Sequence, residues 1–73
     1  MINQIIKFHK ELQKGETVKI ITSLPDYKTY INRTDVLKQE KDILLILRAN
    51  GAKVAINCQY IISCCVIEGG FKW

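Results

Sequence analysis

The sequence predicts a mainly β protein, in which an N-terminal α-helix precedes a five-stranded, strongly bent antiparallel sheet that closes into a small barrel. Three observations lead to this prediction. Apolar residues recur at steps of three and four only at the start of the chain, the period changes to two after Gly15, and Asn50-Gly51 separates two β-rich runs. A chain of 73 residues makes one domain, residues 1–73. Small all-β domains usually close, because closure removes exposed sheet edges.

The first half of the chain is expected to hold the helix and two strands. The helix, at about residues 2–13, has one stripe of apolar or weakly polar residues: Ile2, Ile5, Ile6, His9 and Leu12. Strands follow at about 17–23 and 27–37. Leu24-Pro25 belongs to the turn that joins them, and residues 32–35 read as a bulge or sharp bend within the second strand.

The strongest local signal is a hairpin with strands at about 42–49 and 52–57. Asn50-Gly51 favours a two-residue type I′ turn, which needs positive φ at both central residues. This register sends one apolar face inward, made of Leu45, Leu47, Val54 and Ile56. It also places Arg48 directly opposite Lys53 on the other face.

The chain ends in a strand at about 61–68 and a tail at 69–73. One turn, "CQY", separates this strand from the hairpin, and "IISCCVIE" is apolar on both faces. We therefore predict self-association through Ile62, Cys64 and Val66. Two interpretations of the tail stay open: Phe71 and Trp73 dock on a surface, or the terminus is frayed.

The order of elements, and the ending of strand, single turn and strand, resembles the Sm-like fold of Sm, LSm and Hfq proteins. "AKVAINCQYIISCCVIE" resembles the second motif of that family, and "GETVKIITS" resembles its opening strand. SH3-like barrels, the wider class, share much of this pattern. The resemblance implies a small Sm-like or SH3-like barrel, a ring built by pairing the fourth and fifth strands of neighbours, and RNA binding at the single turn. Two departures stand out: "YINRTDVL" has no glycine, and Asn57-Cys58-Gln59-Tyr60 has no positive charge.

The three cysteines, Cys58, Cys64 and Cys65, invite a metal interpretation, with His9 as a fourth ligand. Geometry argues against it, because adjacent residues of a strand point to opposite faces and no Cys-x-x-Cys pair is present. We expect the cysteines to be packing residues, with no metal and no cofactor. The odd number of cysteines favours a reducing cytoplasm.

The formal net charge of +4 is compatible with binding a polyanion. The candidate contacts to nucleic acid are Arg48, Lys53, Asn57 and Tyr60, with Lys28 and Arg33 as outer electrostatic support. Tyrosines at positions 27, 30 and 60 suit stacking on unpaired bases. The alternatives are that the charged side chains extend into water and that the tyrosines pack in the core.

The leading hypothesis is a self-associating, non-catalytic module that binds RNA. The alternative is a protein-interaction or structural module without a nucleic-acid ligand, and a third interpretation is a minor subunit of a larger assembly. We expect no enzyme, because no nucleophile lies beside a base and no glycine-rich phosphate loop or carboxylate pair is present. No apolar run is long enough for a membrane helix, and no signal peptide is expected.

Overall fold

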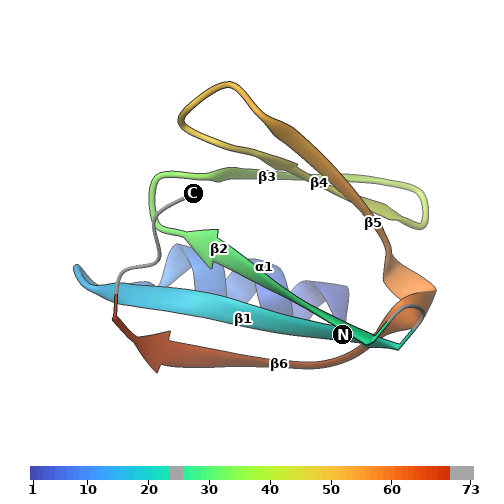
Figure 1. Cartoon of the computed structure of the whole chain (residues 1–73), viewed down its shortest axis with the longest axis horizontal. Helices are drawn as coiled ribbons and strands as arrows, with labels where there is room; N and C mark the ends of the chain where they lie inside the picture. Colours follow the sequence, from blue (N-terminus) through green and yellow to red (C-terminus); the bar gives the residue numbers. More distant parts are fainter. Residues whose placement is uncertain (24–25, 70–73) are drawn as a thin grey trace.

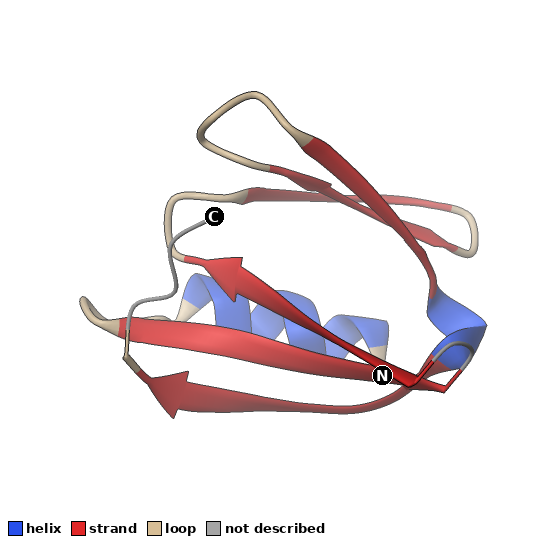
Figure 2. Cartoon of the chain, in the orientation of Figure 1, coloured by secondary structure: helices blue, strands red, loops and turns tan. Residues whose placement is uncertain are grey.

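A computed structural model describes residues 1–23 and 26–69, which form one helix and two antiparallel sheets of three strands each (Figures 1 and 2). The elements follow the chain in this order: α1 Ile2–Lys10, β1 Glu16–Ser23, β2 Asp26–Asn32, β3 Val36–Glu40, β4 Ile43–Leu47, β5 Lys53–Asn57, the 3₁₀ turn η1 Cys58–Tyr60, and β6 Ile61–Glu68. The turn expected at Leu24-Pro25 and the tail from residue 70 lie outside the described residues.

The two sheets have the strand orders β2-β1-β6 and β3-β4-β5. Figure 1 shows them as two layers, with α1 running beside β1 and with η1 joining the layers between β5 and β6. The helix contacts β1 and β6. Because β1 is the central strand of the first sheet and β4 of the second, β2, β3, β5 and β6 are sheet edges.

The core fills the space between the two sheets and the helix. The alternation of β1 sends Val18 and Ile20 inward, where they meet Leu44 and Ile46 of β4 and Ile5 of α1, and all five side chains are fully buried. Burial of each such side chain stabilises the fold by about 1.5–3 kcal/mol. The helix is therefore held by tertiary packing of its apolar stripe, since nine residues alone make a marginal helix.

The helix is shorter than the predicted range of 2–13 and ends at Lys10. Its last turn tightens, because the N–H of Glu11 donates to the carbonyls of both Lys7 and Phe8. Leu12 lies beyond this turn and is still buried in the core. The apolar spacing that suggested another helical turn thus reflects a loop residue that packs inward.

The predicted five-stranded barrel is wrong, because neither sheet is closed or strongly curled. The single strand expected at 27–37 is two strands, and β2 pairs only with β1 whereas β3 pairs only with β4. Asp35 fixes the turn that separates them. Its carboxylate accepts a hydrogen bond from the N–H of Asn32 (2.8 Å), and its own N–H donates to the carbonyl of Asn32 (3.0 Å).

The predicted register of the β4–β5 hairpin is wrong by one residue. Three residues, 49–51, form the loop, because the N–H of Arg48 donates to the carbonyl of Ala52 and the N–H of Gly51 donates to the carbonyl of Arg48. Leu47 therefore faces Lys53, and Ile46 faces Val54. A shift of one residue exchanges the faces of a strand, so Leu44 and Ile46 enter the core in place of Leu45 and Leu47.

Candidate functional site

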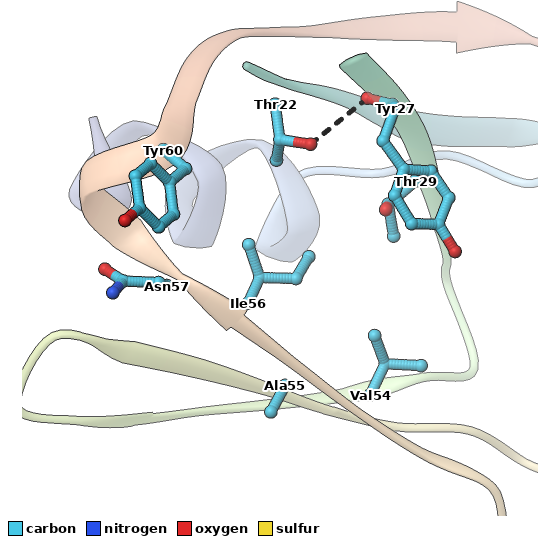
Figure 3. A pocket seen from close by; sticks show the side chains of 8 residues that line it. All are labelled: Thr22, Tyr27, Thr29, Val54, Ala55, Ile56, Asn57 and Tyr60. Atoms are coloured by element: carbon cyan, nitrogen blue, oxygen red, sulfur yellow. Dashed lines mark hydrogen bonds between the residues drawn. The ribbon is translucent and has the colours of Figure 1, made fainter. Parts of the chain in front are cut away.

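A groove runs between the two sheets, along the edges of β2 and β5. It consists of two adjoining hollows, of about 280 Å³ and about 290 Å³, that share Tyr27, Thr29 and Val54. At one end the first hollow is completed by Thr22, Ala55, Ile56, Asn57 and Tyr60 (Figure 3). At the other end the second hollow is completed by Lys28, Arg48, Asn50 and Ala52. We call the two hollows together the seam groove.

The backbone of β2 presents hydrogen-bonding groups to the seam groove. The carbonyl of Tyr30 accepts a hydrogen bond from Nη1 of Arg48 in the second sheet, so this carbonyl points away from β1. In a strand, residues two apart direct their backbone groups the same way. The N–H and C=O of Lys28 therefore also point away from β1, toward the groove.

The same reasoning orients the backbone of β5. The carbonyl of Ala52 accepts a hydrogen bond from the N–H of Arg48, and the N–H of Cys58 donates to the carbonyl of Asp42, so both residues direct these groups to the β4 side of the hairpin. Ladder hydrogen bonds in an antiparallel pair involve alternate residues, which are here the even-numbered ones. The odd-numbered residues, Ala55 and Asn57 among them, direct their N–H and C=O groups away from β4 and toward the groove.

Two tyrosines stand on opposite sides of the first hollow (Figure 3). Tyr27 is 59% exposed and Tyr60 is 37% exposed, so both rings are available to a ligand. Tyr60 is held by η1, and the side chain of Asn57 caps this turn by accepting the N–H of Gln59 at 3.1 Å. Ser23 also donates to the carbonyl of Tyr60 (3.4 Å), which ties η1 to the end of β1.

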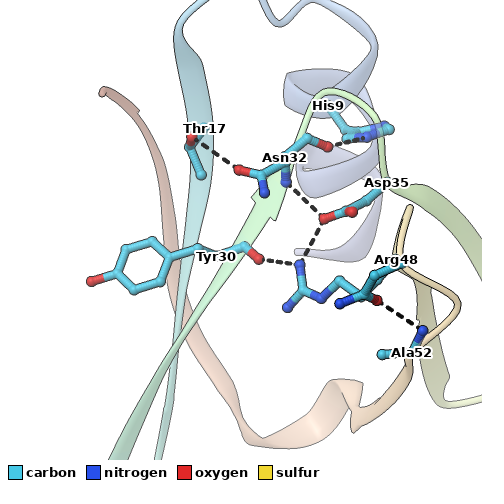
Figure 4. A network of polar contacts seen from close by, with 8 residues as sticks. His9, Thr17, Tyr30, Asn32, Asp35, Arg48 and Ala52 are labelled. Carbon is cyan, nitrogen blue, oxygen red and sulfur yellow. Dashed lines mark hydrogen bonds and ion pairs between the residues drawn. The ribbon is translucent and has the colours of Figure 1, made fainter. Parts of the chain in front are cut away.

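Arg48 is buried and ion-paired at the far end of the groove (Figure 4). Its Nη1 lies 2.6 Å from Oδ2 of Asp35, and the two side chains are 6% and 2% exposed. Together with the bond to the Tyr30 carbonyl, this pair joins the two sheets. The predicted cross-strand pair of Arg48 and Lys53 is wrong, since Lys53 faces Leu47 and is exposed.

The polar network around Asp35 extends to the helix (Figure 4). Nε2 of His9 lies 3.2 Å from the carbonyl of Asn32, and Oγ1 of Thr17 donates to Oδ1 of Asn32 (3.4 Å) and to the carbonyl of Gly69 (3.0 Å). His9, which the sequence offers as a fourth metal ligand but does not favour in that role, therefore connects α1 to the end of β2. Polar contacts therefore cross-link the end of β2 at Asn32, and the seam groove follows the same edge of this strand from Arg48 toward Tyr27.

Of the six predicted nucleic-acid contacts, the structure brings four to the seam groove: Lys28, Arg48, Asn57 and Tyr60. Lys53 is exposed on β5, and Arg33 is exposed in the turn between β2 and β3. Sequence reasoning missed Thr29 and Val54. The alternation of Tyr27, Thr29 and Ile31 along one face of β2 could have indicated Thr29. The position of Val54 in the groove could be found only once the hairpin register was known.

The cysteines are free thiols, and Cys64 and Cys65 face opposite sides of β6, beside Ile20 and Lys19 respectively. Burial raises the pKa of the Cys58 and Cys64 thiols, and nearby Asp42 adds to the rise at Cys58. Within the described residues, no group of three or more His, Cys, Asp or Glu side chains is placed to hold a metal ion.

The predicted association residues lie along the outer edge of β6. Ile62 is 56% exposed, Val66 is 37% exposed, and Cys64 is half-buried. No helix in the described ranges has the length and apolar character needed to span a bilayer.

Comparison with known proteins finds no match to a family model, to a curated protein or to a solved structure. The resemblance to Sm-like proteins therefore stays a prediction from the sequence.

Proposed function

We propose that this protein is a non-catalytic protein-interaction module that binds an extended segment of a partner protein in the seam groove. The observation that carries the proposal is the meeting of two sheet edges at one hollow with an apolar lining. Backbone groups of Lys28 face the groove from β2, and those of Ala55 and Asn57 face it from β5. A segment lying between them gains main-chain hydrogen bonds from either edge, as in β-strand addition.

The side chains of the groove indicate the composition of the bound segment. Val54, Ile56 and the two tyrosine rings favour aliphatic or proline side chains at alternate positions. Lys28 and Lys53 are exposed on the two strands that flank the second hollow. An acidic residue at that end of the segment complements their charge.

Charge also explains why a protein segment is favoured over RNA. Phosphate binding needs several uncompensated cations in one groove. Arg48 is neutralised by Asp35, and Lys53 and Arg33 do not line the groove. Lys28 is then the one lining cation that has no acidic partner among the ion pairs of the described residues.

The test is selection of random peptides displayed on phage, with the wild-type protein as bait and Tyr60→Ala for counter-selection. We expect enriched peptides with alternating apolar residues and an acidic residue toward one end. Synthetic versions should bind with a dissociation constant on the order of micromolar, as small transient interfaces do. Tyr27→Ala and Tyr60→Ala should each weaken binding about tenfold or more, because each removes an aromatic anchor.

Two controls separate the groove from the general surface. Lys28→Glu should weaken binding of the acidic peptides, whereas Lys38→Glu, an equal charge change on β3, should not. The proposal fails if no peptide is enriched over the Tyr60→Ala background. It also fails if single-stranded oligouridine RNA binds the wild-type protein at physiological salt and Tyr60→Ala abolishes that binding.

A further inference from the structure

The outer edge of β6 is a second exposed surface, on the side of its sheet opposite the seam groove. The strand is eight residues long and pairs only with β1. Its one charged residue, Glu68, lies at its end. Exposed edges in natural proteins are usually protected by lysine, proline or a covering segment, because a bare edge recruits another strand.

Each of the other three edges carries at least one lysine, which suits a partner strand of complementary charge but not an apolar one. β2 has Lys28, β3 has the exposed ion pair of Lys38 and Glu40, and β5 has Lys53. In β6, by contrast, exposed Ile62 and Val66 lie on either side of Cys64 along the strand. This difference singles out β6 as the edge that another apolar strand can cover without burying a charge.

The backbone of β6 is oriented to accept that strand. The N–H of Gly69 donates to the carbonyl of Gly15, which marks odd-numbered residues as the ones that bond to β1. Cys64 and Val66 therefore direct their N–H and C=O groups outward. Ile62 lies at the irregularity where the pairing with β1 shifts between Ile21 and Thr22.

We propose that the partner is a second copy of this chain, whose β6 pairs antiparallel with the first across a two-fold axis at Cys64. In this register Cys64 meets its own copy, and Ile62 of each chain meets Val66 of the other. Shifting the axis to Cys65 places Glu68 opposite Ile62, and shifting it to Val66 places Glu68 opposite Cys64. Of these three registers, the axis at Cys64 is the one that pairs apolar residues with each other and leaves the carboxylates outside the paired strands.

The N-terminus of α1 extends this apolar edge. Met1 is 56% exposed, and Sγ of Cys64 lies 3.6 Å from its Sδ. The side chain of Met1 therefore borders the proposed axis and adds apolar surface to the contact. Because β1 separates β6 from β2, the dimer leaves the seam groove open.

Sedimentation of the full chain tests the proposal. The wild-type protein should sediment as a dimer of 8.4 kDa subunits at micromolar concentration. Ile62→Lys and Val66→Lys should sediment as monomers, because a two-fold interface would bury the new lysine of both copies. Val36→Lys is the matched control, since Val36 is 57% exposed on another edge, and it should stay dimeric.

Cross-linking with a short bismaleimide tests the axis without altering the edge. In a variant whose one cysteine is Cys64, the two thiols face each other and should give a covalent dimer. A variant whose one cysteine is Cys58, also half-buried, should not. A monomeric wild-type protein, an assembly larger than two, or equal cross-linking of the two variants overturns the proposal, and none of these outcomes bears on peptide binding in the seam groove.

Discussion

Arg48 shows how one side chain positions the site. It projects from the end of the second sheet, and its guanidinium meets Asp35 in the β2–β3 turn and the carbonyl of Tyr30 in the first sheet. The contact holds the sheets together at one end of the groove and neutralises a charge that the sequence suggested for phosphate binding. A buried arginine among apolar residues could not be recognised from its neighbours, because its partner lies thirteen positions away in a turn.

Removing this arginine should strongly destabilise the fold. Arg48→Met leaves the Asp35 carboxylate buried without its ion partner, which costs about 3–5 kcal/mol of the free energy of unfolding. Urea denaturation measures the loss. Lys38→Met removes one partner of the exposed pair with Glu40 and should change stability by less than about 1 kcal/mol. Equal losses for the two variants would contradict the role assigned to Arg48.

The thiols should differ in reactivity and in their response to pH. Burial raises the pKa of Cys58 and Cys64 above the ordinary value of 9.0, so little thiolate is present at pH 8. Mass spectrometry should therefore show iodoacetamide modifying exposed Cys65 before the other two. A faster reaction at Cys58 or Cys64 would contradict their burial.

The same shifts predict a loss of stability at high pH. A thiol whose pKa is raised by folding holds its proton more tightly in the native state. Its stabilising contribution is fully present below the unfolded pKa and declines as the pH rises through 9 toward the raised folded value. Unfolding measured across this range should show a smaller decline for the Cys58→Ser, Cys64→Ser double variant than for the wild-type protein.

At the scale of elements, the sequence predicted where strands occur better than how they pair. Alternation and the Asn50-Gly51 signal located the β4–β5 hairpin. The loop length could not be read, because Ile43–Leu47 is apolar throughout and either register buries leucine or isoleucine. The division of residues 27–37 into β2 and β3 could not be read from the sequence either, because it depends on the contact of Asp35 with Asn32.

Glycine should stabilise both hairpin turns, because each turn holds one residue at positive φ. Gly51 has φ of 91° with no atom near an added Cβ, so Gly51→Ala should lower the unfolding free energy by about 1 kcal/mol through backbone strain alone. Lys41 has φ of 53° in the β3–β4 turn, and Lys41→Gly should raise it by about 0.5 kcal/mol. Thermal melts measure the stability of the two variants against the wild-type protein. Stability changes of the same sign in both variants would contradict these turn conformations.

The candidate site was predictable only in part. Asn57 and Tyr60 could be placed beside each other because η1 is a single short turn. Their proximity to Tyr27 and Thr29 could not be predicted, because it requires two sheets that stay open along β2 and β5. Closure into a barrel would have consumed the same backbone groups that now face the groove.

For the whole molecule, the decisive feature is that two small sheets share a core without joining their edges. The core holds the sheets face to face, and the Arg48–Asp35 pair fixes one end. The seam and the outer edge of β6 then remain as two separate surfaces for strand pairing. One of them suits an extended segment of another protein, and the other suits a second copy of the chain.

Residue-resolved amide hydrogen exchange, in the free protein and with a selected peptide bound, tests the open seam most directly. The amides of Lys28, Ala55 and Asn57 should exchange fast in the free protein and slowly in the complex, because the peptide backbone then pairs with them. The amides of Val54 and Ile56, which face β4, should be protected in both states. Slow exchange of all three seam amides in the free protein would mean that β2 and β5 pair with each other, and would contradict the account.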